Sequence, residues 1–156
     1  MRPMQDETQQ LADHPFLKGL EPEHVELLTR EARRTRFPAG TVIAREGDEG
    51  HRFYLLLAGE VAVEALIPGK GQVAFQTVGA GDALGWSWLF PPYRWHFTAR
   101  AATEVEAFEW DTEKLRELGD KDPRFGYEMS RRLIQLLLRR LQATHNQLVE
   151  FYGPTT

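Results

Sequence analysis

The sequence predicts a mainly β protein with flanking helices, in which an antiparallel sandwich or barrel lies between short N-terminal helices and one long C-terminal helix. Three observations support this class. Short β-rich segments separated by Gly, Pro and Asp fill the region from Phe37 to Asp111. Residues 11–34 have an interrupted helical stripe, and apolar residues recur every three or four positions after Pro123.

The N-terminal region divides into a polar end and two short helices. Residues 1–10 carry no apolar run and are expected to be flexible. Within residues 11–34, Pro22 after Glu21 suits the first turn of the second helix, and Arg30 suits its C-terminal end. We expect these helices to pack on the β region as part of one unit, residues 11–122.

The β region contains short segments rich in Val, Ile, Leu, Phe and Tyr. Ala58-Gly59-Glu60 separates two of them and predicts a hairpin, and Pro68-Gly69-Lys70-Gly71 predicts another turn. The expected strands lie within residues 41–44, 53–57, 61–65, 73–78, 96–100 and 105–110. Many short strands at this spacing are typical of an antiparallel sandwich or barrel.

The C-terminal helix is expected to run over residues 123–152, with residues 153–156 as a tail. It is longer than the roughly 11–12 residues of an average helix, and one small β unit would not cover it. Its apolar stripe therefore predicts a homodimer seam, although packing on its own domain alone would also explain a stripe. The residues assigned to the seam are Met129, Leu133, Leu137, Leu141 and Leu148.

Composition limits the functions that the chain can perform. Its 156 residues are enough for one domain, and a net charge of −4 argues against a dedicated nucleic-acid surface. The chain has no cysteine, so disulfides and thiol catalysis are excluded. The N-terminus does not resemble a signal peptide, and no apolar run is long enough to span a membrane, so we expect a cytoplasmic protein.

Five motifs in a fixed order carry a resemblance to a known family. They are FPAGTVIAREGD at 37–48, FYLLLAGEVAV at 53–63, GAGDALG at 79–85, ARAATEVEAFEWD at 99–111 and RRLQATH at 139–145. Together they resemble the cyclic-nucleotide-binding domain of the catabolite activator and Fnr family, over roughly residues 14–150. The resemblance implies a jelly-roll-like antiparallel β-roll. The DNA-binding helix-turn-helix of that family would follow the long helix, so we expect no DNA binding through this chain alone.

The resemblance also implies a ligand site at the phosphate cassette. In the family a cassette glycine, a glutamate and an arginine hold the cyclic phosphate and the ribose, and a threonine of the long helix and its neighbour contact the base. Gly85 matches the cassette glycine, but Trp86 stands at the position of the glutamate. Thr144 matches the threonine, with His145 as its neighbour.

The arginine position is ambiguous, because counting from either side gives a different residue. Counting back from Arg100 places Trp95 there, and counting forward from Phe90 places His96 there. Arg94 is close enough to reach a phosphate, but a shift of one residue moves a side chain to the other face of a strand. Thr98 lies near the hydroxyl residue that follows the arginine and could donate to an anion.

The aromatic residues of the cassette allow two interpretations. Trp86, Trp88, Trp95 and Phe97 either form an aromatic cavity for a planar ligand or fill the pocket as hydrophobic core. The candidate pocket therefore comprises Gly85, Trp86, Ser87, Trp88, Arg94, Trp95, His96, Thr98, Thr144 and His145.

These observations predict a non-catalytic regulatory or sensor module that does not bind cyclic AMP in the usual way of the family. Its ligand would be a cyclic nucleotide or another small planar or anionic molecule, with no metal or other cofactor, because the five histidines include no His-x-His pair. The alternatives are a ligand-free dimeric interaction scaffold and a truncated transcriptional regulator. If the chain is complete, its output passes to a protein partner. Arg131-Arg132 and Arg139-Arg140 are either a solvated face or a site for phosphate or an acidic partner.

Overall fold

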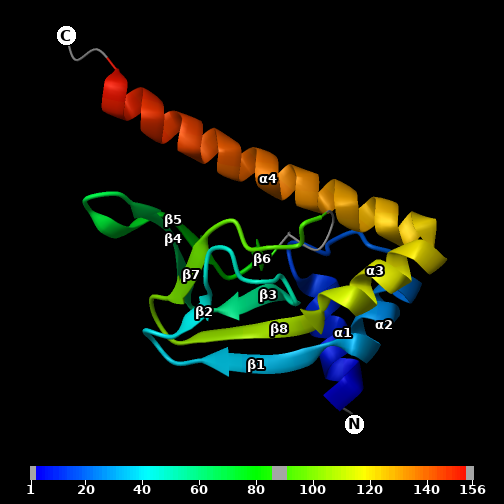
Figure 1. Cartoon of the computed structure of the whole chain (residues 1–156). Coiled ribbons are helices and arrows are strands. Elements are labelled where there is room, and N and C mark those ends of the chain that lie inside the picture. The colour runs from blue at the N-terminus through cyan, green and yellow to red at the C-terminus, as the bar shows by residue number, and fades with distance from the viewer. Residues whose placement is uncertain (1–2, 86–90, 154–156) are drawn as a thin grey trace.

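The computed structural model describes residues 3–85 and 91–153, and it confirms the predicted class of an antiparallel β-roll with short N-terminal helices and a long C-terminal helix (Figure 1). The elements are α1 (Pro3–Asp13), α2 (Pro22–Glu31), β1 (Arg33–Phe37), β2 (Val42–Ala44), β3 (Arg52–Ala58), β4 (Glu60–Ile67), β5 (Gly71–Gly79), β6 (Ala83–Leu84), β7 (Thr98–Ala101), β8 (Val105–Asp111), α3 (Thr112–Lys121) and α4 (Pro123–Tyr152).

The described strands form two antiparallel sheets, with the orders β1-β8-β3-β6 and β2-β7-β4-β5. Their inner faces share an apolar core that includes Val61, Val63, Ala99 and Ala101, each at most 2% exposed. Gly59 makes the tight β3–β4 connection possible, since it has φ +91° and a Cβ there would lie 2.1 Å from the Glu104 carbonyl oxygen. The predicted turn at residues 58–60 is therefore present, but the predicted hairpin is wrong, because β3 pairs with β6 and β8 in one sheet whereas β4 pairs with β5 and β7 in the other.

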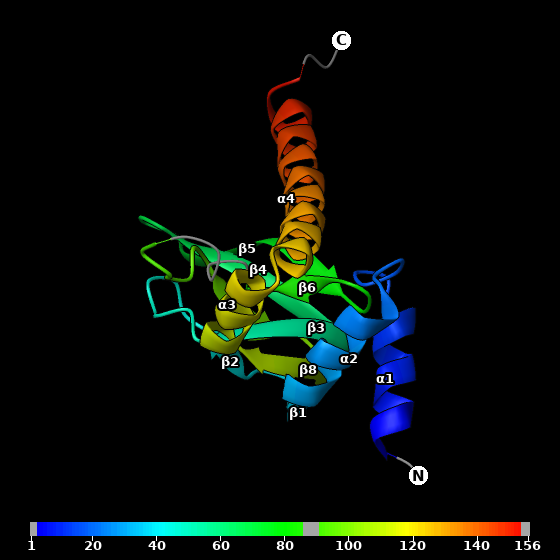
Figure 2. The ribbon, with the colours of Figure 1, turned by 90° about the vertical axis from the view of Figure 1, so that its right-hand side faces the viewer.

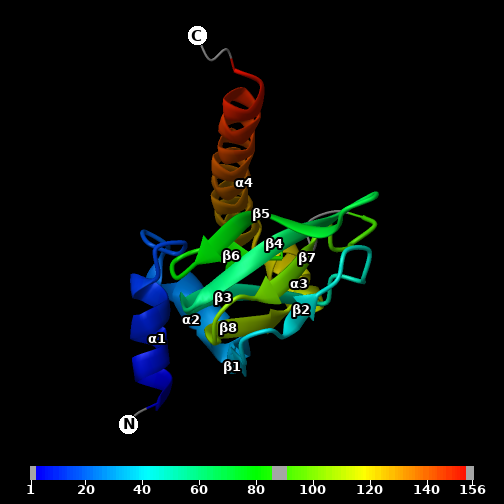
Figure 3. The ribbon, with the colours of Figure 1, turned by 90° about the vertical axis from the view of Figure 1, so that its left-hand side faces the viewer.

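The helices form a second core at one end of the roll. Leu11 and Leu17 from the N-terminal segment, Leu28 from α2, and Phe125 and Met129 from α4 are each at most 1% exposed in this cluster. Figure 2 shows α1 and α2 beside the sheet that contains β1, β3 and β8, and Figure 3 shows β4, β5 and β7 from the other side of the roll. The N-terminal half of α4 is thus fixed to the body of the domain.

The connection between α3 and α4 is short, and the two helices pack closely against each other. The Asp111 carboxylate accepts from the Glu113 N–H, and the Asp122 carboxylate accepts from the N–H groups at the start of α4, so both helices are capped as they begin. Gly119 and Gly126 bring the two helices together, because a Cβ on Gly126 would lie 3.2 Å from the Gly119 carbonyl oxygen.

The structure corrects part of the seam prediction in α4. Met129 and Leu133 are fully buried in the core of their own domain, so they cannot lie on an exposed seam. Leu137 is half-buried, whereas Leu141 and Leu148 are 66% and 54% exposed. From Leu137 to Tyr152 no residue is buried as a whole, and this half of the helix runs over β5 and away from the end of the roll where α1, α2 and α3 lie (Figure 1). None of the described helices combines the length and the apolarity that a membrane crossing requires.

Candidate ligand site

Gly85 follows β6 and is the residue at which the candidate site begins. Its φ is +96°, a backbone conformation that L side chains rarely adopt. A Cβ at this position would lie 2.8 Å from the Arg52 carbonyl oxygen and 3.0 Å from the indole of Trp95. Glycine is therefore required here by its backbone conformation and by two close neighbours.

Trp95 is the side chain that covers this glycine. It is 6% exposed, belongs to the core of the roll and packs edge-on against Phe97 with 5.8 Å between ring centroids. Its backbone is held by the Gly47 N–H, which donates to the Trp95 carbonyl at 2.8 Å, and by its own N–H, which donates to the Asp48 carbonyl at 2.8 Å. The indole thus lies directly against the cassette glycine.

The neighbours of Trp95 alternate between the interior and the surface, as an extended backbone requires. Trp95 and Phe97 are buried, whereas Arg94 and His96 are exposed. Arg94 uses its Nη1 to donate to the Gly47 carbonyl at 2.9 Å at the surface. Of the three residues between which the sequence left the arginine position open, the structure therefore places Trp95 inside the roll.

Thr98 is 4% exposed, and its hydroxyl oxygen accepts from the Glu46 N–H at 3.1 Å. It fixes the turn that precedes β3 to the start of β7. Trp86, Ser87 and Trp88, which complete the predicted cassette, lie outside the described residues.

The two candidate residues of α4 differ in their surroundings. Thr144 is half-buried and faces β5: its hydroxyl donates to the Arg140 carbonyl at 3.1 Å and accepts from the Gln76 side-chain amide at 3.0 Å. His145 is exposed. Gln76 was not identified from the sequence, because nothing local to β5 reveals a partner 68 positions away on a helix.

Arg140 also reaches the roll, whereas its neighbour Arg139 is exposed. The Arg140 Nη2 donates to the Ala83 carbonyl in β6, two residues before Gly85, and its Nη1 is buried without a hydrogen-bond partner among the residues that the structure describes. Burial lowers the pKa of this guanidinium, and the nearby Asp82 carboxylate opposes that shift. The sequence had singled out the Arg139-Arg140 pair without distinguishing its two members.

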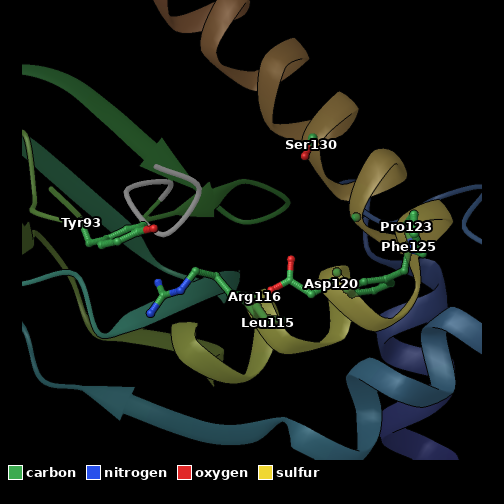
Figure 4. Close-up of a pocket in the computed structure, with 9 residues that line it drawn as sticks. Tyr93, Leu115, Arg116, Asp120, Pro123, Phe125 and Ser130 are labelled. Carbon is green, nitrogen blue, oxygen red and sulfur yellow. The ribbon is translucent and has the colours of Figure 1, made fainter. Parts of the chain in front are cut away.

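Two cavities flank these residues. One, of about 310 Å³, lies between β5 and α4 and is lined in part by Gln76, Asp82 and Arg140. The other, of about 470 Å³, lies in the angle between α3, α4 and the loop that carries Tyr93 (Figure 4). Tyr93 has a left-handed φ of +58°, and the Arg116 guanidinium lies 4.4 Å from its ring centroid.

Comparison with known proteins identifies the family. The family profile described as "Cyclic nucleotide-binding domain" matches residues 34–122, which is more than half of the chain. The chain belongs to the cyclic nucleotide-binding domain family.

Several individual proteins are similar to the chain. It is 30% identical over 140 residues to the CRP-like cAMP-activated global transcriptional regulator of Mycobacterium tuberculosis, covering 90% of this chain and 61% of the regulator. The chain thus spans about three fifths of the length of that relative. A putative cyclic nucleotide-binding protein from Geobacter metallireducens superposes with a TM-score of 0.78 and 25% identity, covering 86% of this chain and 97% of the other. The catabolite activator protein of Thermus thermophilus superposes with a TM-score of 0.69 and 27% identity, covering 88% of this chain and 62% of the activator protein.

The described part of the site places an uncharged side chain against a glycine. Gly85 has a positive φ, and the indole of Trp95 packs against it in the core of the roll. Among residues 3–85 and 91–153, no three His, Asp or Glu side chains are grouped closely enough to hold a metal ion. The charged side chains that line the two cavities are Asp82, Arg139 and Arg140 in one and Arg116 and Asp120 in the other.

Proposed function

We propose that this cyclic nucleotide-binding domain is a non-catalytic regulatory sensor that does not hold cyclic AMP in the usual way of the family. Its ligand would be a small planar or anionic molecule that enters between the roll and α4. The observation that carries the proposal is the position of Trp95, whose ring contacts the cassette glycine inside the core of the roll.

The physical reason lies in how a cyclic phosphate is held. A charge-assisted hydrogen bond from arginine contributes roughly 1.5–3 kcal/mol, whereas an indole carries no positive charge. If Trp86 stands at the position of the family's glutamate, as the sequence resemblance implies, the acceptor for a ribose hydroxyl is missing too, because an indole only donates. Loss of both interactions would weaken cyclic nucleotide binding by about a hundredfold or more.

The test is a titration of the purified protein with cyclic AMP and cyclic GMP, followed by tryptophan fluorescence and melting temperature together. We expect no saturation below millimolar nucleotide for the natural sequence. Trp95→Arg introduces a charge into the core, so it is titrated only after circular dichroism shows that it is folded, and the folded variant should then bind cyclic AMP saturably. Arg94→Ala is the matched control and should leave the titration unchanged. Saturation at micromolar nucleotide in the unmodified protein would refute the proposal.

A homodimer through α4 is a second part of the proposal. Ile134, Leu138, Leu141 and Leu148 are each more than half exposed, and they follow each other at spacings of four, three and seven residues. This is the heptad spacing of a coiled-coil seam, and it lies on a different face of α4 from Met129 and Leu133. The output would pass from this seam to a protein partner in the cytoplasm.

The rival function is a ligand-free dimeric scaffold, and the burial of Trp95 supports it too. The scaffold would keep the same seam but would bind none of the nucleotides, before or after Trp95→Arg. The titration therefore separates a sensor with a changed phosphate site from a scaffold that has lost the site.

A further inference from the structure

The C-terminal half of α4 is held against the roll by polar side chains. The Gln76 amide nitrogen donates to the Arg140 carbonyl at 2.9 Å and to the Thr144 hydroxyl at 3.0 Å. The Gln147 amide donates to the Phe75 carbonyl at 2.9 Å. Because no residue from Leu137 to Tyr152 is buried, this half of the helix has little apolar packing on its own domain. We call the contact of Gln76 with Arg140 and Thr144 the clasp.

The hydrogen bonds of the clasp use every proton that the Gln76 amide nitrogen and the Thr144 hydroxyl can donate. A side-chain amide nitrogen has two protons, and the two acceptors of Gln76 account for both. The Thr144 hydroxyl has one proton, which it donates to the Arg140 carbonyl one turn earlier in the helix, so Thr144 meets Gln76 as an acceptor. A ligand group that hydrogen-bonds Thr144 in place of Gln76 must therefore be a donor.

We propose that Gln76 gates the ligand site: its amide holds Thr144 while the site is empty, and a ligand that reaches Thr144 displaces it. This inference rests on the proposed function, in which a ligand enters between the roll and α4. Gln76 lines the cavity between β5 and α4 together with Arg140, so a ligand in that cavity would lie beside the clasp.

Displacement of Gln76 would have a consequence beyond the site. The clasp joins β5 to α4 one to two turns beyond Leu136, the last buried residue of the helix. Among the described residues, its opening leaves two hydrogen bonds between this half of α4 and the roll, from Arg140 to the Ala83 carbonyl of β6 and from Gln147, farther along the helix, to the Phe75 carbonyl of β5. Ligand binding is thereby coupled to the position of the part of α4 that carries Leu141 and Leu148, without any change in the buried half of the helix.

The first measurement is amide hydrogen exchange of the ligand-free full chain at one protein concentration. We expect Gln76→Ala to speed exchange of residues 140–150 by about tenfold, since it removes two hydrogen bonds to this half of the helix, and to leave residues 123–136 unchanged. Gln72→Ala is the matched control, because it makes the same substitution at an exposed position of β5. Equal exchange in Gln76→Ala and Gln72→Ala would overturn the proposal.

The second measurement is the affinity for cyclic AMP in the Trp95→Arg background. If Gln76 gates the site, the double variant Trp95→Arg/Gln76→Ala should bind cyclic AMP about tenfold more tightly than Trp95→Arg, because the ligand no longer competes with the Gln76 amide for Thr144. Weaker binding would show that Gln76 is a ligand contact and would overturn the gate. If a Trp95→Arg variant that is folded by circular dichroism binds no cyclic AMP, the proposed function fails, and the exchange result still decides whether the clasp holds α4.

Discussion

Trp95 offers the sharpest test of whether the interior of the roll is core or an open ligand cavity. The side chain is 6% exposed and contacts Gly85 and Phe97. A buried tryptophan removes roughly 150–250 Å² from water, which at ~25 cal/mol per Å² corresponds to about 4–6 kcal/mol as an upper estimate. Measured Trp→Ala substitutions in cores cost about 3–5 kcal/mol, so we expect Trp95→Ala to destabilise the domain by that amount.

The assay is urea unfolding followed by far-ultraviolet circular dichroism at a fixed protein concentration, because association would make the midpoint depend on concentration. Trp95→Phe should lose less, since it retains a ring, and it keeps the series measurable if the alanine variant does not fold. Arg94→Ala, one residue earlier and at the surface, should cost no more than about 1 kcal/mol. If Trp95→Ala cost no more than Arg94→Ala, the indole would line an open pocket and our reasoning would be refuted.

Three further predictions concern a glycine, a histidine and the seam. Gly85→Ala should destabilise the domain by about 1–3 kcal/mol more than Gly40→Ala in the same urea assay. Both glycines have a positive φ, but of the two only Gly85 has atoms within 4 Å of the position of a Cβ. Equal losses of stability in the two variants would contradict the steric argument. Burial holds the pKa of His14 below its usual 6.5, and the His14 Nδ1 accepts from the Phe16 N–H at 3.1 Å, so the unfolded chain binds a proton more readily than the folded one. The free energy of unfolding should therefore fall as the pH falls below 6.5. His14→Gln should flatten this loss, and an unchanged pH profile would exclude His14 as its cause. Leu138→Glu, at a position 59% exposed, should convert the proposed dimer into a monomer in sedimentation equilibrium without lowering the monomer's stability. A dimer that persists would place the interface elsewhere, and an unmodified protein that is already a monomer would refute the seam.

Much of the fold could be predicted because it depends on local chemistry. Gly59 and Gly85 occupy positive-φ positions at connections that the motifs had marked, and Pro123 opens α4 as its fixed backbone angle favours. The β-rich segments became strands because their side-chain types and turn residues act over a few positions. The same local signals are what the family resemblance preserves.

The candidate site was less predictable because its residues meet across long stretches of sequence. The sequence could not decide among Arg94, Trp95 and His96, since one residue of register exchanges the two faces of an extended segment. Only packing against Gly85 and Phe97 placed Trp95 inside. Gln76 likewise acquires its significance from Thr144, 68 positions away.

By itself, then, the sequence determined the class of fold, the positions of its turns and the length of its last helix, because each follows from conformational preferences of neighbouring residues. Tertiary structure alone decided which apolar face of α4 is core. That helix is apolar on two sides, and the 3.6-residue period does not distinguish a face that packs on its own sheet from one left for a partner. Burial of Met129 and Leu133 and exposure of Leu138 and Leu141 follow from where the roll and the N-terminal helices lie against α4, which no local preference encodes.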